Sequence, residues 1–364
     1  MHSIDALPQL VHVVRRYGDV GGMETYVWKL THRLAEVGVN VVVICEETSK
    51  VRASKIRVIE LPRGKLRPRW KAMLRFRRLV DVTLSKEFQG ESLIVHSHER
   101  TISHHVTTFH GPPMAPKGYF SSLWWLSPRL RAWEKMERHE ITSKGVQKLL
   151  VVSELVRQQL CNKYPCLNTD IMHIAMPGVE PLQSTDTASA SFEPSQKKFL
   201  FVGKEWKRKG LIKAVEIFSA YKSEFGNATL DVFGPDASGL SWLKKIDGVE
   251  LKGWVSSVPW QEYDILIHPA SCEPFGMVIS EARREGVGVL LSELVGAASL
   301  PYRGVAVVPL ELSVERWVRA LHILLFSDYK RPEVLWTWDD LVDFHLDHVY
   351  SKVEVIPFVT GHCQ

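Results

Sequence analysis

Short apolar runs alternate with longer stretches of helical periodicity along the first half of the chain. Met23–Val37 carries its apolar residues at helical spacing and ends at Gly38, which is typical of an amphipathic helix. Strands that alternate with helices predict a parallel sheet covered by helices, an α/β fold. The apolar runs that predict buried strands are Leu10–Val14, Val39–Cys45, Leu93–His96, Val106–Phe109 and Leu149–Val152.

A change of composition divides the chain in two. Residues 180–197 are rich in Ser, Thr, Ala and Pro, a composition that predicts a linker. A second alternation of strands and helices follows, so we interpret the chain as two βαβ domains, residues 1–179 and 198–335, with the chemistry between them. The second alternation consists of the strands Phe199–Val202, Thr229–Phe233, Asp264–His268 and Val287–Leu291 and the helices Leu211–Tyr221 and Met277–Glu285.

Two further segments have a helical pattern. Tyr119–Thr142 predicts a helix that Pro128 breaks or kinks, because proline has no backbone N–H to donate. Trp336–Val353, within the last segment of the chain (residues 336–364), predicts an amphipathic helix.

The composition is that of a soluble globular protein, with 45% hydrophobic and 24% charged residues in a chain of 364, long enough for two domains. No apolar stretch approaches the roughly 18–20 residues that span a bilayer. Met1–Pro8 lacks the basic start and apolar core of a signal peptide. The five cysteines are odd in number and scattered, which does not suit a disulfide framework. We therefore expect a cytoplasmic, reduced protein.

The net charge of +5 is unevenly distributed. A basic block at Leu61–Val80 has no acidic residue and eight basic ones: Arg63, Lys65, Arg67, Arg69, Lys71, Arg75, Arg77 and Arg78. This block is open to three interpretations, namely a solvated face, contact with an anionic membrane surface and contact with an anionic acceptor; nucleic acid is the least favoured partner. Apolar residues interleave with the block, and Ser122–Leu126 adds an aromatic patch, so buried core packing and a membrane interface both stay open.

Two carboxylates, Glu273 and Glu281, are separated by seven residues next to a predicted strand. The pattern puts Glu273 in the loop that leaves the carboxyl end of Asp264–His268, and Glu281 a turn or two into the following helix. Ligands of open α/β sheets bind at that edge. The alternative is an ordinary strand, loop and helix with two surface glutamates.

A basic loop leaves the first predicted strand of the second domain. The strand ends at Gly203, and a helix begins near Gly210, so backbone N–H groups and the positive helix end point to one place. Between them, Arg208 offers a fork matched to phosphate oxygens and Lys209 a compact charge. A diphosphate group is the ligand that this pattern predicts, and a solvated basic turn is the alternative.

The glycines and histidines of the first domain are less specific. The turn that contains Gly21 and Gly22 lacks the G-x-G-x-x-G spacing of a dinucleotide site. His96 and His98 lie on the same side of a predicted strand, with His104, His105 and His110 close by in the sequence. No carboxylate or cysteine with metal-ligand spacing completes them, so we predict no metal site.

Several motifs resemble those of retaining glycosyltransferases with the GT-B architecture, particularly the large family 4 that includes lipopolysaccharide-core sugar transferases. The resemblance implies a GT-B fold, with two Rossmann-like domains facing each other across a cleft and a terminal helix crossing back to the first domain. The motifs are Glu273-x7-Glu281, the strand–Gly203–basic loop–Lys209–Gly210, Gly21-Gly22-Met23-Glu24, Thr108-Phe109-His110-Gly111, Val151-Val152-Ser153-Glu154 and Trp338-Asp339-Asp340.

The resemblance also implies roles for single residues. Glu281 would accept hydrogen bonds from the donor ribose, and Glu273 would hold hydroxyls of the donor sugar. Arg208 and Lys209 would stabilise the charge of the departing nucleoside diphosphate, and His110 would contact the sugar or the reacting centre. The remaining donor contacts would come from Gly21, Gly22, Gly203 and the amides of Phe275, Gly276 and Met277.

The sequence departs from the family pattern at three positions. Pro177 stands where the family has an asparagine, so no role of that side chain transfers. The family has a later Gly-Gly pair, of which this chain keeps only Gly296, so a contact of Gly296 with the donor stays open. Gly288 stands where the family has a proline.

The predicted function is transfer of a hexose from a nucleotide-diphosphate sugar, with a UDP-sugar favoured, to a hydroxyl of a glycan or glycolipid. The resemblance suggests lipopolysaccharide core or other cell-envelope synthesis, with retention, no cofactor, no divalent metal and no nucleic acid partner, and with possible peripheral attachment to the inner face of the cytoplasmic membrane. The alternatives are another GT-B enzyme, such as a nucleotide-sugar epimerase or a glycogen- or sucrose-type transferase, and a non-catalytic basic binding module.

Overall fold

The computed structural model describes residues 7–18, 20–49, 55–64, 67–114, 126–182, 196–234 and 239–355. The chain forms two compact units, Met1–Gly178 with Trp338–Gln364 and Val179–Thr337. Three predicted features lie wholly or mostly outside the described residues. They are the linker, Lys65 and the aromatic patch, of which only Leu126 is described. Within the described ranges, no helix combines the length and the apolar character needed to cross a membrane.

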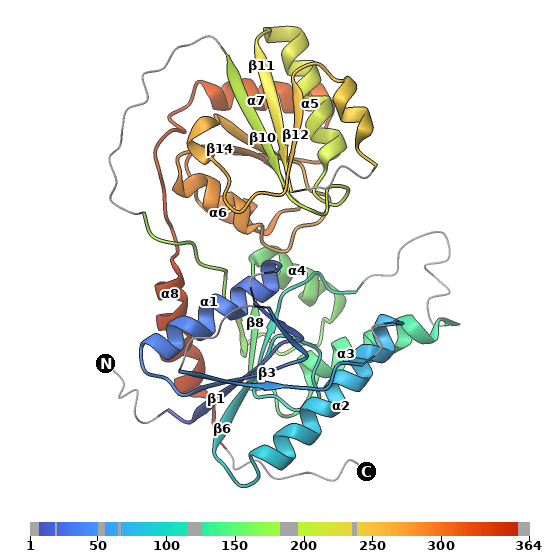
Figure 1. Ribbon diagram of the computed structural model, residues 1–364, viewed down its shortest axis with the longest axis vertical. Coiled ribbons are helices and arrows are strands. Elements are labelled where there is room, and N and C mark those ends of the chain that lie inside the picture. The colour runs from blue at the N-terminus through green and yellow to red at the C-terminus, as the bar shows by residue number, and fades with distance from the viewer. Residues whose placement is uncertain are drawn as a thin grey trace. The chain divides into compact units, whose positions relative to one another are not determined.

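The first unit is built on a seven-stranded sheet in the order β5-β3-β1-β6-β7-β8-β9, and every pairing in it is parallel (Figure 1). Parallel strands are buried on both faces, which explains the near-continuous apolar runs of the central strands. The strands are β1 (Gln9–Val13), β3 (Val41–Cys45), β5 (Ile56–Glu60), β6 (Leu93–Ser97), β7 (Val106–Phe109), β8 (Lys148–Val151) and β9 (Met172–Ile174), with a separate short pair, β2 (Arg16–Tyr17) and β4 (Glu47–Thr48).

The helices of the first unit are α1 (Gly22–Glu36), α2 (Arg69–Glu87), α3 (Pro128–Thr142) and α4 (Glu154–Lys163). Pro128 is the first residue of α3 rather than an interior one, a position where its missing N–H has no partner to lose. The hydroxyl of Ser127 caps this helix by accepting from the Leu130 amide. The residues of the predicted helix that precede Leu126 lie outside the described ones.

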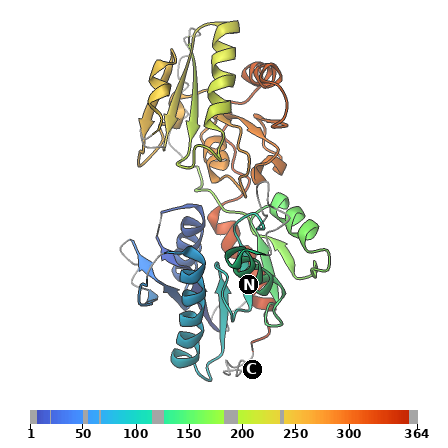
Figure 2. The same cartoon turned by 90° about the vertical axis from the view of Figure 1, so that its right-hand side faces the viewer.

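The C-terminal segment packs into the first unit, where Figure 2 shows it in red among the blue and green elements. It is not one regular helix: α8 (Trp338–Phe344) passes into a π-helical turn, His345–Val349, and then a 3₁₀ turn, Tyr350–Lys352. Arg33 of α1 donates a 2.7 Å hydrogen bond to Asp339 of α8, while Trp338, Leu341 and Val349 are buried.

The second unit has a six-stranded parallel sheet in the order β12-β11-β10-β13-β14-β15. Its helices are α5 (Leu211–Phe225), α6 (Met277–Arg284) and α7 (Val314–Leu325). Its strands are β10 (Lys197–Val202), β11 (Ala228–Phe233), β12 (Val249–Gly253), β13 (Ile265–His268), β14 (Gly288–Ser292) and β15 (Val305–Val308).

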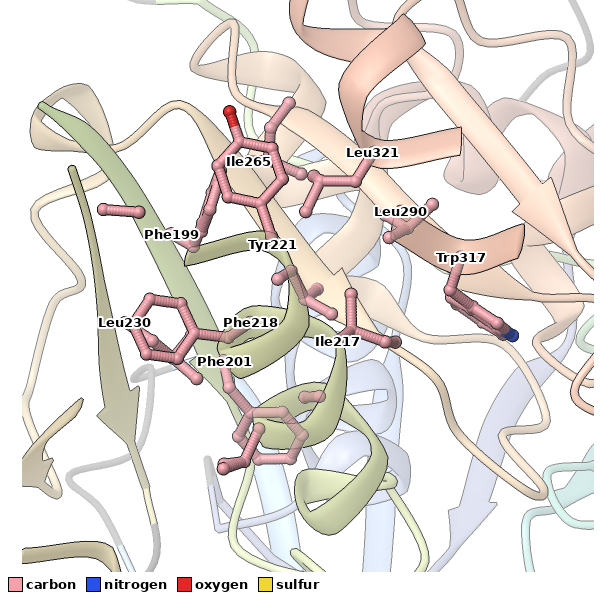
Figure 3. Close-up of a cluster of buried hydrophobic side chains, with 14 of the residues drawn as sticks. Phe199, Phe201, Ile217, Phe218, Tyr221, Leu230, Ile265, Leu290, Trp317 and Leu321 are labelled. Atoms are coloured by element: carbon pink, nitrogen blue, oxygen red, sulfur yellow. The ribbon is translucent and has the colours of Figure 1, made fainter. Parts of the chain in front are cut away.

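Alternate residues of these strands enter two hydrophobic clusters, one on each face of the second sheet. On one face, Phe199, Phe201 and Ile265 pack against α5 and α7 (Figure 3). On the other face, Leu200 and Leu266 pack with residues of α6. Successive side chains of a strand point to opposite faces of the sheet, and here both sets are apolar. Helices therefore have to cover both faces.

The apolar pattern did not reveal the edges of the two sheets. The outermost strands of the two sheets are β5, β9, β12 and β15, and none of them was predicted. β12, for example, alternates half-buried with exposed residues, as in Val249-Glu250-Leu251-Lys252-Gly253. An edge strand exposes part of its surface, so its sequence does not need a continuous apolar run.

Candidate functional site

The basic loop of the second unit begins at Gly203, directly after β10. Gly203 has φ = +151°, and a Cβ built there would lie 2.1 Å from Cδ of Lys209. The Lys209 side chain thus crosses the space that any other residue would fill. The loop needs glycine here so that the lysine ammonium can reach across the end of the strand.

The same loop ends at Gly210, the N-cap of α5, which has φ = +82°. A Cβ at Gly210 would lie 2.0 Å from the backbone oxygen of Pro269, which follows β13. Ser271 strengthens this junction, because its amide donates to the Arg208 carbonyl at 2.9 Å. The loops after β10 and β13 are therefore held together through backbone atoms.

This junction brings Arg208, Lys209 and Glu273 into one ion-pair cluster. Oε2 of Glu273 lies 3.2 Å from Nη1 of Arg208 and 3.1 Å from Nζ of Lys209. Arg208 also donates to Glu205, from Nε at 2.9 Å. Burial lowers the pKa of the Arg208 guanidinium, but Glu273 and Glu205 outweigh this effect and raise it. The carboxylates thus neutralise the two cations predicted to bind phosphate.

His268 lies beneath this cluster at the end of β13, and no sequence pattern predicted a role for it. Its side chain is fully buried, with Nε2 3.9 Å from Oε2 of Glu273. Burial, together with Lys209 and Arg208, holds the pKa of the imidazole well below its usual range, so it is neutral. Among the described residues, neither ring nitrogen has a hydrogen-bond partner.

Backbone hydrogen bonds fix the loop from Glu273 to Phe275 against residues 294–297. The Glu273 amide donates to Leu294 at 3.0 Å, and the Gly296 amide donates to Glu273 at 2.9 Å. The Ala297 amide donates to Phe275 at 2.8 Å. The amide of Gly296, whose donor contact the sequence left open, is therefore already occupied.

Helix α6 begins directly after this loop. Gly276 is its N-cap, with φ = +93°, and Met277 is its first residue, so the amides of the first turn face away from the helix body. Glu281 lies in the second turn and is partly exposed. The second unit thus gathers Gly203, Arg208, Lys209 and Glu273 at one edge of its sheet and places Glu281 on the helix that starts there.

The two predicted glycines of the first unit lie at the start of α1. Gly21 is the N-cap and is extended, with φ = −170°. A Cβ on Gly22 would meet nothing within 4 Å, so local packing does not require glycine there. Glu24, two residues later, is buried and forms an ion pair with Arg16.

The histidines of the first unit separate into groups. His96, His98 and His110 come together at the carboxyl ends of β6 and β7, with the His96 and His98 ring centroids 4.3 Å apart. His12 of β1 joins them, since its register partner across the sheet is His96. His104 lies elsewhere, bonded to Thr101 and to the Glu140 carbonyl, and Nδ1 of His105 accepts from the Val95 amide.

His12, His96 and His98 could hold a metal ion on distance alone, because one nitrogen from each lies within 4.8 Å of the others. However, all of their ring nitrogens already have hydrogen-bond partners. The group contains no carboxylate or thiolate, and an unbalanced dication in a buried site is costly. The arrangement is better described as a hydrogen-bonded network of neutral imidazoles.

The basic block forms the start of α2 and the turn before it. Met73 and Phe76 are part of the hydrophobic core, so these interleaved apolar residues cannot contact a membrane. Arg77 is also buried and donates to the Thr101 carbonyl. The cations that remain exposed are Arg63, Arg67, Arg69, Lys71 and Arg78.

Two protein-family models match the chain, one in each unit. The model described as Glycosyltransferase Family 4 matches residues 20–181, and the model described as Glycosyl transferases group 1 matches residues 196–326. Together they account for most of the sequence. Among curated proteins, none matches.

Solved structures resemble this chain over nearly its whole length. WaaG, described as a glycosyltransferase involved in lipopolysaccharide biosynthesis, is 17% identical with a TM-score of 0.73, and the match covers 94% of this chain and 96% of WaaG. Sucrose-phosphate synthase from Thermosynechococcus elongatus is 16% identical with a TM-score of 0.68, covering 94% and 98%. Anabaena HepE in complex with UDP and glucose is 11% identical with a TM-score of 0.62, covering 95% and 100%. At these identities the likeness shows the fold, which agrees with the predicted class.

The contact between Gly210 and Pro269 can be tested by substitution. We expect Gly210→Ala to destabilise the second unit by more than the ~1–2 kcal/mol of a left-handed backbone conformation, because it adds a clash with a carbonyl. Gly239→Ala is the control, since Gly239 has φ = +75° but nothing within 4 Å of a built Cβ. Urea unfolding of both variants measures the difference, and equal losses would contradict the role given to this contact.

Proposed function

Because the chain belongs to the family 4, group 1 glycosyltransferases of the GT-B fold, we propose that it transfers a hexose from a nucleotide-diphosphate sugar to a hydroxyl of a glycan or glycolipid. The observation that carries this proposal is the cluster of Arg208, Lys209 and Glu273 at the sheet edge of the second unit. UDP is the favoured nucleotide, and HepE, which was solved with UDP and glucose, supports that choice.

The ion-pair cluster suits exchange of one anion for another. A donor diphosphate that enters beside Arg208 and Lys209 replaces the Glu273 carboxylate as their partner, so the cations are not left unpaired at any stage. The carboxylate of Glu273 is then available to accept hydrogen bonds from hydroxyls of the donor sugar. The first-turn amides of α6, from Met277 onward, offer further donors to the sugar and phosphate.

Catalysis follows from the charge that develops as the glycosidic bond to phosphate breaks. Negative charge grows on the departing diphosphate, and Arg208 and Lys209 stabilise it more strongly in the transition state than in the ground state. Glu281 accepts hydrogen bonds from the ribose hydroxyls and fixes the nucleotide. We assign His110 a contact with a substrate hydroxyl, and the anomeric configuration is retained.

The acceptor is a lipid-linked glycan of the cell envelope, such as a growing lipopolysaccharide core. The likeness to WaaG supports this choice over other acceptors. The exposed cations at the start of α2 attach the protein to the inner, anionic face of the cytoplasmic membrane, where such an acceptor is presented. Thermal stabilisation by UDP-, GDP- and ADP-sugars, followed by assay of sugar release, tests the donor class.

Arg208→Ala and Glu281→Ala should each lower turnover of the preferred UDP-sugar by about 10²–10³, which corresponds to ~2–4 kcal/mol of lost transition-state contact. Lys207→Ala is the control, because Lys207 is exposed and stacks over Trp206. Steady-state kinetics on folded variants provide the measurement. Wild-type rates in both site variants would remove these residues from the site.

Sugar transfer should be independent of divalent metal, because two basic side chains and a helix end neutralise the diphosphate. Activity measured after exhaustive treatment with EDTA should equal that of the untreated enzyme. Loss of activity that magnesium or manganese restores would show that a cation shares this role.

Membrane attachment should depend on the exposed cations of the basic block. Replacing Arg67, Arg69 and Lys71 with glutamate should abolish sedimentation with anionic vesicles at low salt, since each basic residue near such a surface contributes about 1 kcal/mol. The control replaces Lys244, Lys245 and Arg319, three exposed cations of the second unit, and changes the net charge equally. If wild-type protein does not bind anionic vesicles even at low salt, the membrane attachment is wrong.

A further inference from the structure

The first unit contains an unbroken chain of hydrogen-bonded side chains that ends at His110. His12, His96 and His98 are buried, whereas His110 is partly exposed. Burial lowers the pKa of His12 and of His110 to about 3, and burial with the neighbouring histidines lowers the pKa of His96 and His98 well below its usual range. Each imidazole is therefore neutral near pH 7 and has one nitrogen that donates and one that accepts.

The links of the chain run between named atoms. Nε2 of His110 lies 3.0 Å from Nδ1 of His98, and Nε2 of His98 lies 3.1 Å from Nδ1 of His12. Nε2 of His12 lies 3.4 Å from the hydroxyl of Tyr350, which in turn lies 2.8 Å from Nδ1 of His96. Each imidazole uses both of its nitrogens in series, so the proton position on one ring fixes that on the next.

The far end of the chain sets its direction. Nε2 of His96 lies 2.7 Å from the hydroxyl of Thr108. Burial raises the pKa of the Tyr26 hydroxyl, and the Thr108 side chain counteracts that rise, as a hydroxyl that donates to the tyrosine oxygen does. The Tyr26 hydroxyl donates to the backbone carbonyl of Ala175 at 3.3 Å. A carbonyl can only accept, so Tyr26 gives it its proton. With the Thr108 hydroxyl donating its single proton toward Tyr26, its oxygen accepts from Nε2–H of His96.

We infer that this chain is a relay that fixes the tautomer of His110. Followed back from Ala175, each link has one direction: Tyr350 donates to His96, His12 donates to Tyr350, His98 donates to His12, and Nε2–H of His110 donates to His98. The remaining nitrogen of His110, Nδ1, then carries a lone pair and accepts a hydrogen bond from a substrate hydroxyl. Tyr26, Thr108, His96, Tyr350, His12 and His98 are positioning residues for this acceptor.

A fifth histidine supplies an internal contrast. Nδ1 of His345 lies 2.7 Å from the carbonyl of Leu341, so it must donate, and this ring takes the opposite tautomer. His345 stacks against His96, with ring centroids 5.6 Å apart, but is not a link of the relay.

Nuclear magnetic resonance of the full-length protein, labelled with ¹⁵N in histidine, tests the relay without any substrate. At about pH 7.5, long-range ¹H–¹⁵N correlations should show the Nε2–H tautomer for His12, His96, His98 and His110, and the Nδ1–H tautomer for His345. An Nδ1–H tautomer or a charged ring at His98 or His110 overturns the proposal. One equivalent of bound metal in the purified protein also overturns it.

Tyr26→Phe removes the hydroxyl that links the relay to the Ala175 carbonyl while keeping the ring. The signal of His110 should then shift toward a mixture of both tautomers. Tyr17→Phe is the matched control, because the Tyr17 hydroxyl is buried and bonded to Thr31 outside the relay. An unchanged His110 tautomer in Tyr26→Phe contradicts the direction assigned here.

The catalytic consequence rests on the proposed function and needs its own readout. With the UDP-sugar that is turned over fastest, Tyr26→Phe should lower kcat/KM about threefold to tenfold, the range of one neutral hydrogen bond. In a His110→Asn background, where the amide oxygen replaces Nδ1 as an acceptor independent of the relay, the same change should have no effect. An equal loss in both backgrounds overturns the positioning role. Absence of turnover with every UDP-sugar refutes the proposed function, while the tautomer result stands by itself.

Discussion

The backbone contact between Gly210 and Pro269 is the constraint on which the site of the second unit depends. It holds the loop after β10 against the loop after β13, and these strands are neighbours in the sheet. Two cations from one loop therefore meet a carboxylate from the other, 65 residues away for Arg208 and Glu273. If a side chain separated the loops, the charges would lie in solvent, where such pairs contribute little.

The sequence predicted those features that a single local pattern determines. The central strands could be predicted because burial on both faces demands apolar runs, and the positions of Gly203, Arg208 and Glu273 followed from the rule that loops leave the carboxyl ends of strands. It did not show that Glu273 pairs with both cations, nor that Gly296 uses its amide within the loop. Those facts depend on atoms brought together by the sheet order, which no local pattern encodes.

The first unit shows the opposite case. His12 is the one polar residue of the apolar run Leu10–Val14, and nothing in that run predicts its partners. Tyr350 and His345 come from the far end of the chain. Only the register of β1 with β6 and the return of the C-terminal segment make them neighbours. Burying so many polar rings is tolerable because each finds a hydrogen-bond partner, and such a network is favourable only when it is complete.

That return has a consequence for how the protein is made. A ribosome synthesises the whole of the second unit before it adds the residues from Trp338 onward that complete the first. The second unit can close its sheet during translation, whereas the first must wait with an exposed apolar face beside α1. A chain terminated early would keep a folded second unit and leave the histidine network without Tyr350.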